Sequence, residues 1–392
     1  MKIYEIGTGY TPIPAQMGAA TEIVVEELTR AFIKNGEDAE IIDISAKERA
    51  KTELPVSEVS VPGKFAGTDV SLGIMHKLKR VVYSVALANY LKNLLKKTNE
   101  KVVLHFHNQY NLFFTLKLVP KKLLKKAIIA YTVHSYIWGD EWDKIEATVK
   151  KKYFQEISCV KNADIVLVLN DITTEHFVNR LGVCKDKIHK IINGVNTDRY
   201  VPLDAATVSE LKKKYGVEGK KVIFQVGSVC ERKNQLGSVK MLTDYMRGHK
   251  DVVYMYAGGI IDGEYQESII NHAKENGISE QIVYVGELVP GEQLNEYYNV
   301  ADCSVFTSSL ESFGLVIIEA ISSGTPVVLG GNLMFELGGG YSMYRSDGEF
   351  VSMVDAALEK GGASGEELGG VLDKYSWNTV ARVHSSIFKE TK

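Results

Sequence analysis

Short apolar runs alternate with longer segments of helical period along most of this chain. The runs are apolar along their whole length, as strands of parallel sheets are when helices cover both faces. The alternation therefore predicts doubly wound α/β layers. A first series of expected strands comprises Lys2–Ile6, Ala39–Ile44, Val102–Phe106, Ala127–Val133, Asp164–Leu169 and Ile188–Ile192. A second series comprises Val222–Val226, Val252–Ala257, Ile282–Val285, Cys303–Thr307 and Pro326–Leu329.

The two series predict two domains. They are separated near Asn196–Leu203, and a length of 392 residues suits two cores better than one. We expect Rossmann-like domains over residues 1–198 and 199–375. A C-terminal helix is expected over 376–392, and packing back on the N-terminal domain is one arrangement open to it. The polar segment 46–72 is rich in Pro, Gly and Ser and is expected to form a long loop.

Composition excludes several classes of protein. A net charge of -3 gives no general sign of a nucleic-acid partner. The four cysteines are scattered without a CxxC pair, which favours a reduced, cytoplasmic setting over a disulfide scaffold or zinc ribbon. The N-terminus lacks the apolar stretch of a signal peptide, and no run of 18 apolar residues predicts a spanning helix.

The segment from Thr307 to Pro326 predicts an anion site. An expected strand ends at Thr307, and a helix is expected to open near Phe313 with Ser312 as its N-cap and to end at Gly324. Helices that start at the carboxyl end of a parallel strand are where such folds bind ligands. The free N–H groups of Gly314–Val316 would then suit a diphosphate.

Two carboxylates flank this helix start. Glu311 precedes the helix and Glu319 lies about two turns in, so the eight residues between them span about 12 Å. That span suits a ligand with a sugar, phosphates and a ribose in line. Glu319 lies in an apolar run, where a charge is costly unless it is hydrogen-bonded. The alternative is that both glutamates face solvent.

The segment resembles the Glu-x7-Glu motif of glycosyltransferase family 4, which comprises retaining enzymes with the GT-B fold. The resemblance extends to Val285–Val289, Leu294, Tyr297–Tyr298, Ala301–Asp302 and Gly324–Val328. It implies two Rossmann-like doubly wound domains facing a central cleft. It also implies that the chain transfers a sugar from a nucleotide sugar.

The resemblance assigns roles in the second domain. Glu319 would bind the ribose diol and Glu311 the donor sugar. The backbone beside Phe313, at Gly314, Leu315 and Val316, would hold the diphosphate. The loop with Glu287 and Leu288 would contact the base.

A second loop resembles the phosphate loop of the family. It runs over Val226–Asn234, and Lys233 falls on the lysine that neutralises the leaving diphosphate. The family usually has an arginine where this chain has Ser228. Arg232 is a candidate replacement at a different offset, and a solvated basic turn is the alternative for both cations.

The first domain is expected to serve the acceptor side. Gly18, with Ala19 and Ala20, resembles the glycine-rich loop of the family, and a plain βα turn is the alternative. His134 closes an expected strand, and the resemblance implies that it contacts the donor sugar across the cleft. His105 and His107 lie on one face of a strand. Without an evident third ligand they do not predict a metal site.

The resemblance implies a retaining transferase with His134, Lys233 and Glu311 as catalytic residues. The donor is expected to be a UDP-sugar, with no cofactor and no metal, and the acceptor a glycan or lipid-linked glycan of cell-surface synthesis. A UDP-sugar epimerase of the GT-B type and an inactive sugar-nucleotide-binding partner subunit remain alternatives. The stretch 75–152 holds 16 Lys or Arg against 5 Asp or Glu, so peripheral contact with anionic membrane is also open beside a solvated helix face.

Overall fold

The chain divides into two compact units in a computed structural model. The first unit comprises Met1–Gly194 together with Trp377–Lys392, and the second comprises Val195–Ser376. The structure describes residues 1–14, 20–65, 74–134, 150–309, 311, 313–331, 340–360 and 365–391.

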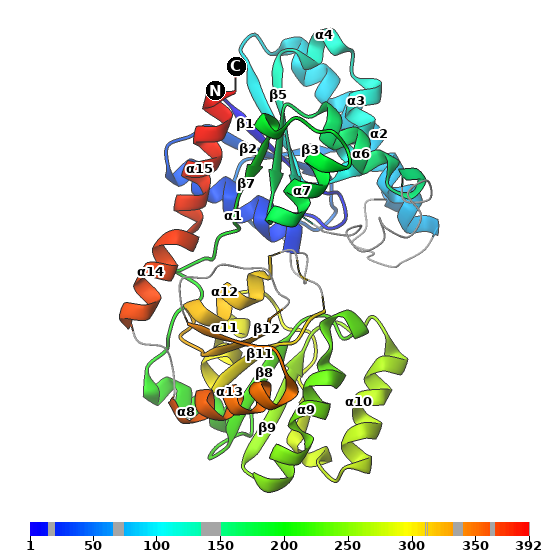
Figure 1. The fold of residues 1–392 in the computed structure, drawn as a ribbon. Coiled ribbons are helices and arrows are strands. Elements are labelled where there is room, and N and C mark those ends of the chain that lie inside the picture. Colours follow the sequence, from blue (N-terminus) through cyan, green and yellow to red (C-terminus); the bar gives the residue numbers. More distant parts are fainter. Residues whose placement is uncertain are drawn as a thin grey trace. The chain divides into compact units, whose positions relative to one another are not determined.

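A seven-stranded parallel sheet forms the centre of the first unit (Figure 1). In spatial order its strands are β3 (Val56–Val59), β2 (Ala39–Ile44), β1 (Ile3–Ile6), β4 (Val102–Phe106), β5 (Ala127–Val133), β6 (Ile165–Val168) and β7 (Ile188–Lys190). The strand order reverses between β1 and β4. In open α/β sheets such a switch point leaves an uncovered crevice at the carboxyl ends of the strands.

Helices cover both faces of this sheet, which explains why its strands are apolar throughout. Tyr4 and Ile6 of β1 belong to the core that includes side chains of the α2, α3 and α6 helices. Glu5 points to the other face, where its neighbour His105 packs against Phe388 of α15. The helices of this unit are α1 (Ala20–Lys34), α2 (Ile74–Lys97), α3 (Gln109–Leu118), α4 (Lys121–Leu124), α6 (Phe154–Asn162), α7 (Asp171–Asn179) and α15 (Trp377–Glu390).

The C-terminal helix α15 packs against α1. Its buried residues recur every three or four positions, so they form one stripe along the helix: Trp377, Val380, Ala381, His384, Ser385 and Phe388. Phe388 is fully buried and lies against the rings of Phe32 and His105. At the start of the helix, Trp377 fills the space beside Gly194, where a Cβ would come within 2.5 Å of the indole.

A six-stranded parallel sheet forms the centre of the second unit. Its order is β10 (Ile282–Tyr284), β9 (Val252–Ala257), β8 (Lys221–Val226), β11 (Cys303–Phe306), β12 (Val327–Gly330) and β13 (Tyr341–Tyr344). Here the order reverses between β8 and β11. One face carries side chains of α9 (Gln235–Gly248), α10 (Gly263–Glu275) and α13 (Asp347–Lys360). The unit also contains α8 (Ala205–Lys214), α11 (Glu292–Val300), α12 (Leu315–Ser322) and α14 (Gly365–Tyr375).

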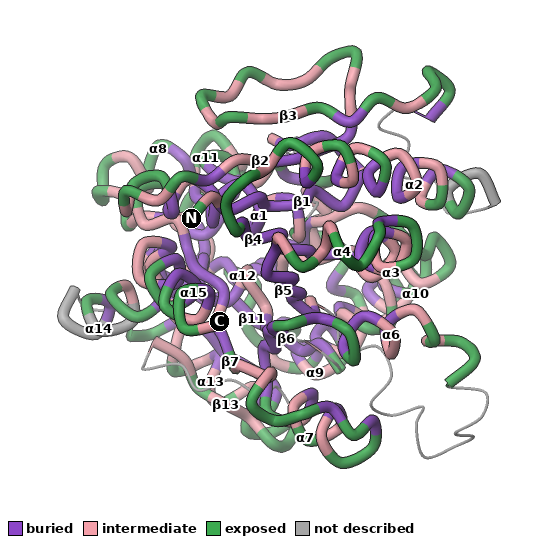
Figure 2. The backbone as a smooth tube through the Cα atoms, turned by 90° about the horizontal axis from the view of Figure 1, so that it is seen from above, coloured by how far each residue is buried: buried purple, intermediate pink, exposed green. Residues whose placement is uncertain are grey.

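Two strands were not expected from the sequence. β3 forms inside the segment 46–72, which was expected to be a loop, and β13 follows the last expected strand. Both are edge strands, and Figure 2 shows β3 with intermediate and exposed segments, unlike the buried central strands. Edge strands lose the continuous apolar pattern because one side of each is not covered. The other expected strands agree with the structure to within two residues at either end.

Within the described part of the chain, no helix combines the length and the apolar character that crossing a bilayer requires. The longest, α2, has 24 residues but carries lysines along its length.

Replacing Phe388 with alanine is expected to destabilise the first unit by about 3–5 kcal/mol. The aromatic ring is fully buried, so its removal leaves a cavity as well as losing apolar contact. Denaturant unfolding measures the change. Val383→Ala on the same helix is the control, because Val383 is 45% exposed and its truncation should change stability by less than about 0.5 kcal/mol. Equal effects of the two variants would contradict the packing of α15.

A buried carboxyl group gives the first unit a pH-dependent stability. Burial raises the pKa of Glu156 from 4.5 to about 7, although the Tyr131 hydroxyl donates to it at 2.7 Å. The folded state keeps this proton while the unfolded state loses it, so wild-type stability falls as pH rises from 4.5 to 7.

Glu156→Gln should remove the loss of folding stability that Glu156 causes as the pH rises. The glutamine amide oxygen still accepts from Tyr131, and the side chain has no charge to bury. The stability difference between variant and wild type should grow by on the order of 3 kcal/mol between pH 4.5 and 7. Unfolding at a series of pH values measures it, with Glu175→Gln at an exposed position of α7 as control. A difference that does not change with pH would contradict the raised pKa.

Candidate functional site

The loops that follow β8 and β11 are tied together at the carboxyl edge of the second sheet. The backbone N–H of Ser309 donates to the carbonyl of Arg232 at 2.9 Å. The Thr307 hydroxyl donates to the Asn234 carbonyl at 3.1 Å, and the Asn234 amide donates to the Thr307 carbonyl at 3.2 Å. Because β8 and β11 flank the reversal of strand order, these loops lie where the fold leaves a crevice.

Glu311 pairs with two cations from the neighbouring loop. Its Oε1 contacts the Nζ of Lys233 and lies 3.3 Å from Nη1 of Arg232. The side chains of Glu311 and Lys233 are only 13% and 14% exposed, whereas that of Arg232 is 49% exposed. Partial burial strengthens the inner pair, while solvent screens the outer one. The expected basic turn is therefore not simply solvated.

Gly227 lets Lys233 lie close to the end of β8. A Cβ on Gly227 would lie 3.2 Å from Cδ and Cε of Lys233, and the φ of this glycine is +150°, which side chains rarely adopt. Ser228 follows, and its carbonyl accepts from the Gln235 amide at 3.0 Å. Ser228 therefore lies in the same loop as the two cations that pair with Glu311.

The α12 helix begins at Leu315, later than the sequence indicated. Gly314 occupies the N-cap position with φ 76°, a left-handed conformation that favours glycine. The expectation that Ser312 caps this helix was wrong, and Ser312 itself lies outside the described residues. The early N–H groups of an α-helix have no partner within the helix, so Leu315 and Val316 carry donors suited to an anion. Phe313 is buried against Tyr375, with ring centroids 6.2 Å apart.

Glu319 is buried and hydrogen-bonded, not solvent-facing. It is 8% exposed, and the Tyr298 hydroxyl donates to its Oε2 at 3.3 Å. The Tyr200 phenol also bonds to this carboxylate. Burial first, and the Glu319 charge second, raise the pKa of both phenols, so each stays protonated and able to donate. The carboxylate is thereby held in place in an apolar helix.

Glu287 and Leu288 follow β10 and lie beside the end of β9. Leu288 is buried. The Glu287 carboxylate lies over Gly259, since its Oε2 would be 3.3 Å from a Cβ there. The N–H of Gly258 donates to the carbonyl of Gly286 at 2.9 Å, which fixes the two loops to one another.

Among the predicted site residues of the first unit, the structure describes His134, which lies at the carboxyl end of a strand. His134 directly follows β5 and is partly exposed. Its Nε2 lies 2.8 Å from Nδ1 of His107. Gly18 and Ala19 lie outside the described residues.

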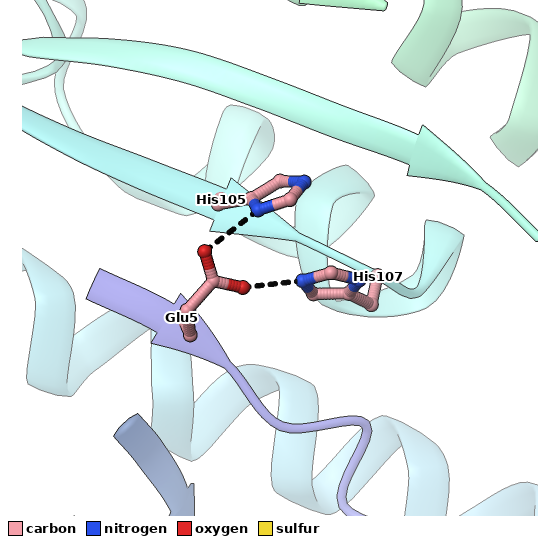
Figure 3. A group of neighbouring side chains, drawn as sticks. All are labelled: Glu5, His105 and His107. Atoms are coloured by element: carbon pink, nitrogen blue, oxygen red, sulfur yellow. Dashed lines mark hydrogen bonds and ion pairs between the residues drawn. The ribbon is translucent and has the colours of Figure 1, made fainter. Parts of the chain in front are cut away.

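Glu5 supplies the third group that the sequence analysis lacked beside His105 and His107. One carboxylate oxygen lies 2.8 Å from His105 Nδ1 and the other 2.6 Å from His107 Nε2 (Figure 3). Two imidazoles and a carboxylate are a zinc-type ligand set, and their ligand atoms lie within 4.8 Å of one another. Both ring nitrogens that face Glu5 are at hydrogen-bonding distance from it in this structure.

Three residues that support these groups were not predicted from the sequence. Tyr298 belongs to the quoted resemblance but was given no role, and Tyr200 was not considered. Glu5 lay within an expected apolar strand and was given no role of its own. The signal that marks Glu5 is a charge in the middle of Ile3–Ile6, which is buried at every position.

Together the second-unit residues offer the chemical groups that an anion joined to hydroxyl-bearing groups requires. Lys233, Arg232 and the start of α12 offer positive charge and N–H donors. Glu311 and Glu319 offer acceptors for hydroxyls. A sugar joined to a nucleoside through a diphosphate presents this combination.

Each of the two units matches a known glycosyltransferase family model. The family model for glycosyl transferases group 1 matches residues 208–334, and the model for glycosyltransferase family 4 matches residues 21–199. The two matches cover the central parts of the second and first units respectively.

Curated relatives resemble parts of the chain. A mannosylfructose-phosphate synthase of Agrobacterium fabrum is 26% identical over 193 residues, which are 47% of this chain and 42% of that protein. A GDP-mannose-dependent phosphatidylinositol monomannoside mannosyltransferase of Mycolicibacterium smegmatis is 28% identical over 176 residues, 43% of this chain and 44% of that protein. This chain thus spans less than half the length of these relatives.

Solved structures match over the whole chain and establish the fold. Anabaena HepE, solved in complex with UDP and glucose, has a TM-score of 0.72 at 13% identity over 99% of both chains. Sucrose-phosphate synthase from Thermosynechococcus elongatus has a TM-score of 0.73 at 18% identity over 100% of this chain and 98% of that chain. With both family models matched and two Rossmann-like units present, the chain belongs to the family-4 type of glycosyltransferases with the GT-B fold.

Proposed function

We propose that this protein is a retaining glycosyltransferase that moves a sugar from a UDP-sugar to a hydroxyl acceptor. The observation that carries the proposal is the pairing of Glu311 with Lys233 and Arg232 beside the start of α12. It places cations, N–H donors and a carboxylate at the switch point of the second sheet. The relatives support a nucleotide-sugar donor, and because one of them is named for GDP-mannose, a GDP-sugar is the competing donor.

The contacts of Glu311 suggest how the donor binds. In this structure Lys233 pairs with Glu311. A diphosphate carries more charge than one carboxylate, so it draws Lys233 and Arg232 to itself. Glu311 is then released to accept hydrogen bonds from the sugar hydroxyls. Glu319, held by two tyrosines, keeps its place and accepts from the ribose diol.

The reaction then requires one bond exchange at the anomeric carbon. The bond from that carbon to the β-phosphate oxygen breaks, and a bond to the acceptor oxygen forms on the same face. The acceptor proton passes to the departing phosphate. Lys233 and the N–H groups of Leu315 and Val316 stabilise the charge that develops on the diphosphate. His134 contributes a contact to the sugar, and Glu311 acts neither as nucleophile nor as base.

The acceptor side of the proposal is a glycan or a lipid-linked glycan used in cell-surface polysaccharide or glycoconjugate synthesis, with the protein acting in the cytoplasm. A basic patch formed by α3, α4 and the residues beside them supports membrane contact. Its exposed members are Lys117, Leu118, Lys121, Lys122 and Lys125. Leu118 is 44% exposed between these lysines. Basic residues around an exposed apolar side chain suit anionic lipid.

A panel of UDP-, GDP- and ADP-sugars tests the donor. A UDP-sugar should raise the melting temperature most, since a ligand at 100 times its Kd adds about 2.7 kcal/mol of stability. Slow release of UDP would accompany transfer to water or to an acceptor. A larger shift with a GDP-sugar would refute the UDP assignment, a new sugar isomer would indicate the epimerase, and binding without turnover would indicate an inactive partner subunit.

Two variants in the same panel test the site. Glu319→Gln should weaken donor binding roughly ten- to hundredfold, the range for a hydrogen bond to a charged group. Lys233→Met should lower turnover by about 10²–10³ because it removes charge stabilisation. Lys240→Met, at an exposed position of α9, is the matched control and should change neither. Wild-type behaviour of Lys233→Met would contradict the proposed mechanism.

Vesicle flotation tests the membrane contact. The chain should float with vesicles of phosphatidylcholine and phosphatidylglycerol, but not with phosphatidylcholine alone. Lys121→Glu with Lys122→Glu should reduce the bound fraction strongly, since each lysine near an anionic surface contributes about 1 kcal/mol. Lys250→Glu with Lys274→Glu, both exposed in the second unit, is the control. Flotation with neither vesicle, or equal loss in both double variants, would end the idea.

A further inference from the structure

A chain of hydrogen bonds runs through the switch point of the first sheet. Glu5 of β1 lies opposite His105 of β4 in the strand register, where the strand order reverses. Figure 3 shows its carboxylate between the rings of His105 and His107. Both rings are buried, and so is Glu5. The proposed function gives none of these three residues a role.

The chain continues from both rings. His107 Nδ1 lies 2.8 Å from Nε2 of His134, and these two rings are stacked with centroids 5.1 Å apart. On the other branch, His105 Nε2 lies 2.7 Å from the hydroxyl of Thr132. His105 also packs against the rings of His384 and Phe388 on α15. Among the residues of this hydrogen-bond chain, only His134, at one end, is partly exposed.

The carboxylate determines where the protons lie. An ionised carboxylate only accepts, so the nitrogens that face Glu5 must carry hydrogen: Nδ1 of His105 and Nε2 of His107. Although burial opposes ionisation, the interaction with His105 and the hydrogen bond of His107 lower the pKa of Glu5 to about 2. Burial, with His105 nearby, lowers the pKa of His107 to about 4 against the pull of Glu5. Near neutral pH Glu5 is therefore ionised and His107 is neutral.

The protonation of His107 determines which nitrogen of His134 carries hydrogen. A neutral imidazole carries one hydrogen, so Nδ1 of His107 is an acceptor and the hydrogen between the rings belongs to Nε2 of His134. Burial, and then the neighbouring His107, lower the pKa of His134 well below its usual value. His134 is therefore neutral as well, and its Nδ1 is left without a proton.

We propose that Glu5 and His107 are positioning residues that hold His134 in the Nε2–H tautomer, so that its Nδ1 accepts a hydrogen bond from a hydroxyl group. The identity of that hydroxyl as one on a sugar rests on the proposed function. In this tautomer His134 supplies no proton from Nδ1. In this proposal His134 orients the sugar, and the departing diphosphate takes the acceptor proton.

The same three residues as a zinc site would require the opposite protonation. A zinc ion held by Glu5, His105 and His107 needs both facing nitrogens without hydrogen. The two readings therefore differ at named atoms. The hydrogen-bonded chain requires hydrogen on Nδ1 of His105 and on Nε2 of His107, whereas a bound zinc ion requires that both nitrogens lack it.

Nitrogen NMR of the full chain with ¹⁵N-labelled histidine tests the tautomer without any ligand. Single His→Gln variants assign the signals, and proton–nitrogen correlations report which ring nitrogens carry hydrogen. Near neutral pH we expect protonated Nε2 on His107 and His134 and an unprotonated Nδ1 on His134. A protonated Nδ1 on His134 would overturn the proposal. So would retention of one added zinc ion per chain with loss of these N–H groups.

Glu5→Leu tests the positioning role. Without the acceptor, His107 can take either tautomer, so His134 should show a mixture and donor affinity should fall about tenfold, the value of one hydrogen bond. Glu156→Leu is the matched control, because it removes another buried glutamate of the same unit that lies outside this chain. It should leave both readouts unchanged.

The outcomes separate the two claims. A changed His134 tautomer with donor affinity equal to that of the control would refute the positioning role. If Glu5→Leu fails to fold, the tautomer of His134 measured in the wild type still tests whether the hydrogen-bonded chain is present. If the wild type binds no nucleotide sugar, the proposed function fails, and the role of His134 toward a sugar fails with it even where the tautomer is as expected.

Discussion

The parallel pairing of β1 with β4 and of β8 with β11 determines where each unit can carry chemistry. At these two places the strand order reverses, so the following loops diverge and polar side chains gather beside them. In the first unit the register sets Glu5 directly opposite His105. In the second it brings the Lys233 loop beside the Glu311 loop, tied by backbone bonds. The functional side chains follow from strand order more than from any local motif.

Three carboxylates at these places are stabilised in different ways. Imidazole N–H groups hold Glu5, tyrosine hydroxyls hold Glu319, and cations hold Glu311. Only the last arrangement can be exchanged easily, because a multivalent phosphate competes for the same cations. The others would leave a buried charge unpaired if broken, which is costly. Glu311 is thus suited to change partners during binding, and the other two are suited to stay fixed.

Local pattern was sufficient to predict most strands, whereas the roles of the second-unit residues came from a family resemblance and stay predictions. The central strands are apolar at nearly every position because helices cover both faces, so they stand out in the sequence. Edge strands β3 and β13 lack that pattern and were missed. The start of α12 was misplaced because a serine before the helix looked like a cap, whereas Gly314 takes that position in a left-handed conformation. Local signals do not report such backbone geometry.

Long-range pairing explains what the sequence could not supply. Glu5 and His107 are about a hundred residues apart, and only the pairing of β1 with β4 makes them neighbours. Their hydrogen bonds to one another and to His134 lie within the first unit, so in the proposed tautomer the Nδ1 of His134 is set to accept a hydrogen bond. Such preorganised polar groups need no rearrangement when charge develops. In the proposed function, a phosphate competes with Glu311 in the second unit for its cations. The two proposals thus assign selection by charge to the second unit and selection by hydrogen-bond acceptance to the first.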